Sequence, residues 1–402
     1  MQVRRNPDPG KKAKSSLLKK IIYPLIFAFC VFILLFSALF DWDSINSYYS
    51  YNTSSLSYVR ARVISIDAEN LTKDSIDESR YLGTQTITVR ILSGEFAGEE
   101  IEITNNLSRT WNVLVKENEY IIVCADNPDN ADAYFTVYNH DRTAALLAIL
   151  LIFSAAVVIV GGFKGLRTLV SLGFAVLFIF LFFVQSIYHG FSIYLVTAAS
   201  LLVICSVTLV LLNGLSTKTF VTIISTFIGV LISGLFCVFS QSILRATGYN
   251  LDDCEALVLI SQSTGLEVGN ILFACVLISS LGAVMDVAVS IVSSLGEVFR
   301  VNSSLSAKEL FSSGMTIGRD MIGTMSNTLI LAFTGTSITT AFLLIAYGYQ
   351  TNQLLSSDFV ALEIIQAISS TFAVIMTVPL SSMITAFFLK RRQRNGKPAA
   401  SI

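Results

Sequence analysis

Residues 270–295 read NILFACVLISSLGAVMDVAVSIVSSL, and this run contains a single charged side chain, Asp286. A helix needs roughly 20 mostly apolar residues to cross a hydrocarbon core about 30 Å thick, so the run predicts a membrane-spanning helix. Composition agrees, because 53% of the 402 residues are hydrophobic and 14% are charged, whereas soluble domains carry about a quarter charged residues. Seven more runs meet the same standard, and the sequence therefore predicts an α-helical polytopic membrane protein with about eight transmembrane helices: 21–40, 143–160, 168–187, 191–212, 220–243, 322–348 and 362–389.

The basic residues between these runs predict an orientation. Lysine and arginine favour the cytoplasmic side of short loops. If the N-terminus lies inside, 18 basic residues of the termini and short loops are cytoplasmic, and one, Arg245, lies in the short outer loops. We therefore expect a bacterial plasma-membrane protein with both termini in the cytoplasm and residues 44–141 outside.

The first apolar run could be an anchor or a cleaved signal peptide. It is long for a signal peptide, and no A-x-A-like site precedes Asp41, so we expect an uncleaved anchor. The expected segments are a basic cytoplasmic N-terminus at 1–20, a transmembrane anchor at 21–40, an extracytoplasmic domain at 44–141, a seven-helix membrane domain at 143–389 and a basic cytoplasmic tail at 390–402.

Residues 44–141 lack a long apolar run and show alternating apolar and polar residues in several short stretches. Period-two alternation with β-branched residues is typical of half-buried strands. The pattern predicts a small β-barrel-like domain, of which an OB-like barrel is one form. A structural or protein-contacting module is the simplest role, and ligand sensing is the alternative. No basic stripe with interleaved aromatics is present, so nucleic acid is not an expected partner. The expected strands are 59–66, 86–91, 100–103, 120–123 and 134–137.

Asp286 is the clearest candidate for a functional residue, because ionisable side chains at membrane depth are costly and mark functional sites. At helical spacing it shares one face with Ser279, Gly282, Ser290 and Ser293, while the opposite face is Val, Ile and Leu. Small residues let another helix approach closely. We therefore expect Asp286 to face the interior of the helix bundle and the lipid to contact the opposite face.

The start of the next span supplies a polar counterpart. Its amide and hydroxyl side chains lie on one face near the expected cytoplasmic end, with an Arg-Asp pair at the inner mouth. Carboxylate, amide and hydroxyl oxygens suit hard cations, and an intramembrane aspartate can relay protons. We expect Asp286 and Asn327 to converge in the inner half of the bilayer. The predicted ion pathway comprises Asp286, Ser290, Arg319, Asp320, Thr324, Asn327 and Thr328.

Two other roles for Asp286 remain open. It could pair with Arg319 or Asn327 only to fix helix packing. It could also form an aspartyl dyad with Asp320, but a dyad needs two carboxyls that share a proton, and Asp320 looks juxtamembrane. We therefore do not expect an enzyme. The two histidines lie far apart and the six cysteines have no paired spacing, so a His-based zinc centre and a cofactor are not predicted, and any metal remains unassigned.

Ser306 and Glu309 have the spacing of a capping box, which predicts that a helix begins here. We expect this helix to cover 305–318, to lie on the cytoplasmic interface and to be broken by Gly314 and Gly318.

Three other features mark turns or irregularities. Asp252 starts an outer helix that ends near residue 265 and is either re-entrant or merely covers the bundle. Residues 161–167 form a tight inner turn, and Pro379 kinks the last span.

Three segments resemble the YibE/F family of bacterial membrane proteins: 161–167, LGAVMDVAVSI at 281–291, and SGMTIGRDMIGTMSNTLILAFTG at 313–335. The resemblance runs from about residue 140 to the end, and the preceding anchor and outer domain are similar to the YibE-type member. It implies a multi-pass envelope protein with a YibF-like membrane protein as its expected partner. A homo-oligomer is the alternative. The motif positions include Asp286, Arg319, Asp320, Asn327 and Thr328, and the resemblance brings no reaction with it.

The sequence therefore predicts a transporter or permease component with a cation- or proton-linked site around Asp286. The alternative is a non-transporting scaffold or envelope sensor whose outer domain binds a partner and whose polar membrane residues only specify packing.

Overall fold

A computed structural model describes residues 31, 56–127, 133–250, 257–259, 261 and 265–394. Most of the predicted anchor at 21–40 and of the outer segment at 252–265 lies outside these residues. The chain divides into two compact units, one formed by residues 49–159 and the other dominated by helices from residue 160 onward.

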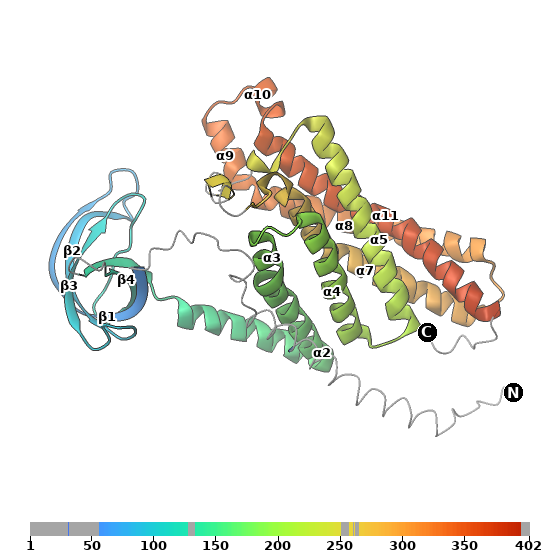
Figure 1. The fold of residues 1–402 in the computed structure, drawn as a ribbon, viewed down its shortest axis with the longest axis horizontal. Coiled ribbons are helices and arrows are strands. Elements are labelled where there is room, and N and C mark those ends of the chain that lie inside the picture. Colours follow the sequence, from blue (N-terminus) through green and yellow to red (C-terminus); the bar gives the residue numbers. More distant parts are fainter. Residues whose placement is uncertain are drawn as a thin grey trace, which may run out of the picture. The chain divides into compact units, whose positions relative to one another are not determined.

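The first unit contains a five-stranded antiparallel sheet with the order β3-β2-β1-β4-β5 (Figure 1). All five predicted strands are present. Irregularities at Val63/Ser65 and Ile66/Ala68 bend the long first strand, so that its first half pairs with β4 and its second half with β2. No ladder joins β3 to β5 among the described residues, and the domain is thus a half-barrel. The strands are β1 Leu56–Lys73, β2 Tyr81–Ile91, β3 Glu100–Leu107, β4 Tyr120–Asp126 and β5 Tyr134–His140.

Alternation along the strands builds the core of this sheet. On β1, Val59, Ala61 and Val63 are buried, while Arg60 and Arg62 between them are exposed. The inward-facing residues of β2, β3, β4 and β5 join the same apolar cluster. Burial of one face of a pleated sheet is what the period-two pattern predicts.

Two buried amides hold the loop between β3 and β4 against the sheet. Asn105 donates to the Val113 carbonyl at 2.7 Å, and the Gln85 side-chain oxygen accepts from the Val115 amide at 3.1 Å. Asn105 also donates to Gln85 at 3.2 Å. These bonds satisfy polar groups that the sheet would otherwise bury unpaired.

From Thr143 onward the chain consists mainly of long helices (Figure 1). Among the described residues, five helical stretches are long and apolar enough to cross a membrane, or six if the bent pair α8–α9 is one span. The elements are α2 Thr143–Phe178, the π-helical turn η2 Ile179–Phe183, α3 Val184–Tyr188, α4 Ile193–Asn213, α5 Thr217–Leu244, the short 3-10 turns Gly248–Asn250 and Val268–Asn270, α7 Ile271–Val301, α8 Ala307–Thr336, α9 Ile338–Ala346, α10 Thr351–Leu355 and α11 Asp358–Arg394.

This number differs from the predicted eight for identifiable reasons. The anchor is not described, and the predicted spans 143–160 and 168–187 belong to one helical stretch of 46 residues. At 1.5 Å per residue this stretch is about 69 Å long, roughly twice what one crossing needs. Gly162 breaks it with non-helical dihedrals (φ 56°, ψ −138°). The predicted turn at 161–167 is therefore a break at a single glycine, where the positive φ favours a residue without a Cβ. The predicted span 322–348 is bent by 52° between α8 and α9.

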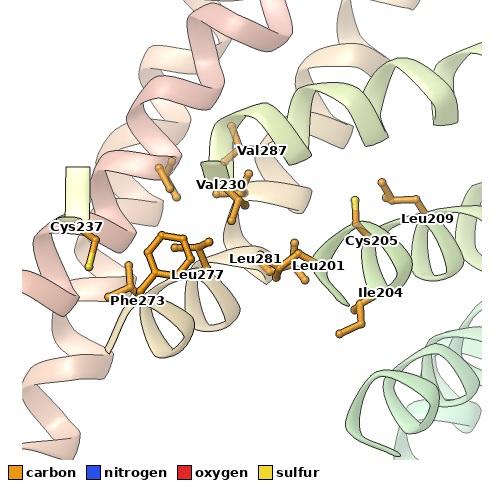
Figure 2. Packing of buried hydrophobic residues seen from close by; sticks show 14 of the residues in the cluster. Leu201, Ile204, Cys205, Leu209, Val230, Cys237, Phe273, Leu277, Leu281 and Val287 are labelled. Carbon is orange, nitrogen blue, oxygen red and sulfur yellow. The ribbon is translucent and has the colours of Figure 1, made fainter. Parts of the chain in front are cut away.

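The core of the helical unit lies between α4, α5, α7 and α11. Figure 2 shows side chains of α4, α5 and α7 gathered in it, with Leu281 and Val287 contributed by α7 and Leu201 by α4. The long last helix packs against α5, α7 and α8, and it continues through Pro379.

One end of the helical unit is basic and tied by polar contacts. Arg392 near the end of α11 donates to the Thr217 hydroxyl at the start of α5, at 2.8 Å. Lys390 and Gln393 both donate to the Ser303 carbonyl between α7 and α8, at 3.4 and 3.0 Å. The start of α5, the α7–α8 connection and the end of α11 therefore lie together.

Candidate functional site

Asp286 does not face the interior of the bundle. On α7, the apolar residues Val284, Val287 and Ile291 are fully buried, whereas Gly282 and Asp286 are exposed. Figure 2 shows Val287 within the core. The predicted orientation of the polar stripe is wrong, because apolar packing among the helices decides which face of α7 turns inward.

The second helix of the site runs straight through the two glycines that were expected to end it. The capping box at Ser306 and Glu309 is present and starts α8, which continues to Thr336. Gly314 and Gly318 are buried, and a Cβ on either glycine would overlap Ser382 or Val378 of α11. The glycines therefore allow close helix packing rather than a break.

The contact between Gly318 and Val378 fixes the level of the Arg-Asp pair. Val378 lies twelve residues before Lys390 on α11, which is about 18 Å at the rise of an α-helix. Arg319 and Asp320 follow Gly318 directly, and both are exposed. They therefore lie away from the basic end of the unit, and their predicted position at an inner mouth stays a prediction.

A second glycine places Asp286 at the same level. Gly229 of α5 lies against both Val284 of α7 and Thr377 of α11. Asp286 is two residues beyond Val284, and Thr377 is next to Val378, so the Asp286 carboxyl, Arg319 and Asp320 share one level to within about one helical turn of 5.4 Å.

Asn327 lies further along α8 than the sequence suggested. It is eight residues beyond Arg319, about 12 Å towards the bend with α9. The expected convergence of Asp286 with Asn327 near the cytoplasmic end rested on a helix start near residue 322, whereas α8 starts at Ala307.

The charged members of the site and Asn327 have no partner within the described part of the chain. The side chains of Asp286, Arg319, Asp320 and Asn327 form no hydrogen bond or ion pair there. The two carboxyls are likewise not hydrogen-bonded to each other, and nothing in the geometry supports an aspartyl dyad.

The hydroxyls of the predicted pathway are bound within their own helix. Thr324 donates to the Met321 carbonyl at 3.1 Å and Thr328 donates to the Thr324 carbonyl at 2.9 Å. Their oxygens keep free lone pairs that can accept further bonds. Ser290 is half-buried one turn from Asp286.

Cavities lie near these residues without enclosing Asp286. A cavity of about 480 Å³ between α3 and α7 is lined almost entirely by apolar side chains and reaches Ser279, two turns from Asp286. A second, of about 330 Å³ between α8, α9 and α11, contains Glu363. Glu363 was not among the predicted site residues, although it is a carboxylate just inside the predicted apolar run 362–389. Groups of three or more His, Cys, Asp and Glu side chains that could hold a metal are absent from the described residues.

The half-barrel carries an exposed aromatic cluster that was not predicted. Tyr58 lies edge-on to Tyr138 with ring centres 4.8 Å apart, and Trp111 lies 5.7 Å from Tyr138. All three rings are exposed. The rings come from β1, β5 and the β3–β4 loop, which only the fold brings together.

Residues 149–391 match the family described as YibE/F-like protein. The chain belongs to the YibE/F family. Residues 55–136 of this YibE/F protein also match the YibE/F family N-terminal domain, which corresponds to the half-barrel. Among curated proteins and solved structures, none matches the chain. The family assignment confirms the resemblance seen in 281–291 and 313–335.

Proposed function

We propose that this YibE/F protein is a permease component with a cation- or proton-linked site around Asp286. The supporting observation is the common level of Asp286, Asp320 and Arg319 in the helical unit. Two carboxyls and one guanidinium lie at that level, and the described residues provide none of them with a hydrogen-bond or ion-pair partner. An excess of one negative charge in a low-dielectric setting favours the uptake of a proton or a cation. Asn327, Thr328 and Thr324 supply oxygens further along α8.

A topology accompanies this proposal. The anchor and the other spans cross the bilayer eight times, with the 46-residue stretch crossing twice around Gly162. Both termini are cytoplasmic and residues 44–141 form an OB-like extracytoplasmic domain. The basic end of the helical unit supports this orientation because Lys and Arg favour the cytoplasmic side. The strand order 3-2-1-4-5, with β3 and β5 at the open edges, supports the OB-like interpretation.

The proposal is tested with Asp286→Asn in purified protein reconstituted into liposomes. Proton flux is followed with an internal pH dye under gradients of H⁺, Na⁺, K⁺ and Mg²⁺. Wild-type protein should move protons under at least one of these gradients, and Asp286→Asn should abolish that flux while thermal unfolding stays unchanged. Glu297→Gln on the same helix is the matched control, because Glu297 pairs with Arg300 near the basic end. Absence of flux in the wild type, or equal flux in Asp286→Asn, rejects the proposal.

A second candidate function is a non-transporting scaffold or sensor whose outer domain binds a partner. The exposed Tyr58, Trp111 and Tyr138 cluster favours it, because exposed aromatic groups recur at binding surfaces. In a deletion strain with a measurable growth defect, Tyr58→Ser with Tyr138→Ser would then fail to complement while Asp286→Asn complements. The opposite pattern favours the permease.

A further inference from the structure

One entire face of α8 is both polar and uncovered. All residues on this face are exposed. They fall on two rows along the helix, each with a spacing of four residues. Leu331 and Ala332 are its apolar members. The face comprises Thr316, Arg319, Asp320, Gly323, Thr324, Asn327, Thr328, Leu331, Ala332 and Gly335.

The opposite face of α8 is fully engaged, so the helix cannot turn to hide these groups. Leu310, Gly314 and Gly318 are buried against neighbouring side chains. Met321, Ile322, Met325 and Leu329 pack against the apolar core.

Two glycines on the open face have empty space beside them. A Cβ at Gly323 or at Gly335 would meet no atom within 4 Å. Gly314 and Gly318, in contrast, are in tight contact with α11. Only two of the four glycines of α8 therefore have a helix packed against them. Because small residues in membrane helices favour close approach of a second helix, Gly323 and Gly335 suit a further helix on the open face.

Lipid is a poor cover for this face. Arg319 and Asp320 lie at the level of Val378, about 18 Å from the basic end of α11. Charged side chains at such depth face protein or water rather than acyl chains. The anchor at 21–40 is a poor cover too, because it carries no charged side chain.

A second copy of the chain fits the charges of the face. Arg319 and Asp320 are adjacent and of opposite sign. In a parallel pair of α8 helices related by a two-fold axis normal to the membrane, equivalent residues lie at the same depth. The Arg319 side of one helix then adjoins the Asp320 side of the other, twice, so that each charge in the pair gains an opposite one. Isologous contacts of this kind are the commonest in homo-oligomers.

We propose that α8 pairs with α8 of a second copy through this face, with reciprocal Arg319–Asp320 ion pairs and the two Gly323 residues allowing close approach. The pairing deepens the proposed function, on which it rests in so far as it completes the charge arrangement beside Asp286. In a single chain, the side chains of Asp286, Arg319 and Asp320 have no ion-pair partner among the described residues.

The first experiment is disulfide cross-linking in native membranes. Leu331→Cys places a thiol on the proposed interface, and Leu235→Cys places one on the exposed side of α5; the two leucines are 61% and 71% exposed. With the native cysteines kept, Leu331→Cys should give a cross-linked dimer on mild oxidation, and Leu235→Cys should give no more than the wild type. Equal cross-linking by the two variants overturns the proposal.

The second experiment exchanges the charges. Arg319→Asp in the Leu331→Cys background should reduce the cross-link to the Leu235→Cys level, because four carboxyls then meet. Adding Asp320→Arg should restore it, because the exchanged pair is again self-complementary. Failure of the double exchange to restore the dimer in correctly inserted protein means that a different protein covers the face, which overturns the proposal.

A third measurement uses wild-type protein only, so that its result does not depend on whether the variants fold. Two differently tagged wild-type copies, co-expressed and solubilised in mild detergent, should purify together, and no co-purification counts against the pairing. None of these readouts involves ion flux. A dimer without flux would reject the permease alone, and flux without a dimer would reject the pairing alone.

Discussion

Gly318 of α8 lies against Val378 of α11 so closely that a Cβ on the glycine would overlap the valine side chain. This contact joins two helices sixty residues apart in sequence and sets the level of the neighbouring Arg319 and Asp320 along the helical unit. We therefore predict that Gly318→Ala lowers stability by about 1–3 kcal/mol through overpacking. Thermal unfolding in detergent measures the loss. Gly173→Ala, at a glycine with no atom within 4 Å of an added Cβ, should be neutral or mildly stabilising. Equal effects of the two substitutions would contradict the close contact.

The capping box gives a second prediction. The Ser306 hydroxyl accepts from the Glu309 amide at 3.2 Å, and Glu309 accepts from the Ser306 amide at 2.6 Å. Ser306→Ala should cost about 0.5–2 kcal/mol, since it removes the cap of α8. Ser303→Ala is the control, because Ser303 contributes its backbone carbonyl to Lys390 and Gln393. Chemical denaturation of the two variants in one detergent compares them, and an unaltered Ser306→Ala would disprove the role of the cap.

A third prediction concerns the buried amide of Gln85. Gln85→Met keeps the side-chain volume but strands the Val115 amide and one bond of Asn105. An unsatisfied buried donor costs about 1–3 kcal/mol. Tryptophan fluorescence in a Trp42→Phe background follows the half-barrel alone, because Trp111 is the other tryptophan of the chain. Gln85→Met should lower the unfolding midpoint of the half-barrel. Thr86→Met, at the next position of β2 on the opposite face of the sheet, should change that midpoint far less. A larger loss at Thr86 would mean that the buried network is not what holds the loop.

The half-barrel should also lose stability in acid. Hydrogen bonds from the Arg109 guanidinium hold the pKa of Asp74 below its usual value, and the Ile76 amide adds to this. Because the folded pKa is the lower one, the contribution is complete above the unfolded pKa of about 4. It is lost as pH falls through the folded pKa. The unfolding midpoint followed by Trp111 fluorescence should therefore decrease as the pH is lowered below about 4. Asp74→Asn should lower this midpoint at pH 7 and make it depend less on pH in acid. An unchanged slope in Asp74→Asn would exclude this carboxylate as a cause.

Local signals in the sequence predicted local structure well. The Ser306 and Glu309 spacing located the start of α8, and alternation located all five strands. Gly314 and Gly318 were misjudged, because a helix-breaking tendency of roughly 1 kcal/mol per glycine is overridden by contact with another helix. Nothing in the local sequence reveals that Gly314 and Gly318 pack against Ser382 and Val378 of α11.

The membership of the candidate site stays a prediction, whereas the orientation expected for Asp286 was wrong. The rule that polar residues face the bundle interior assumes that one chain forms the whole bundle. The rule failed for Asp286 because the apolar side of α7 fills the core. Asn327 was placed too near the basic end because α8 starts fifteen residues before the predicted span.

The contacts of Arg392, Lys390 and Gln393 tie one end of the helical unit, whereas α9 at the other end has no buried residue. Segments with few buried contacts open at the least cost in free energy. We therefore expect α9, beyond the bend at Ser337, to move more readily than the basic end of the unit. A spin label on α9 should detect that movement before a label at the basic end does.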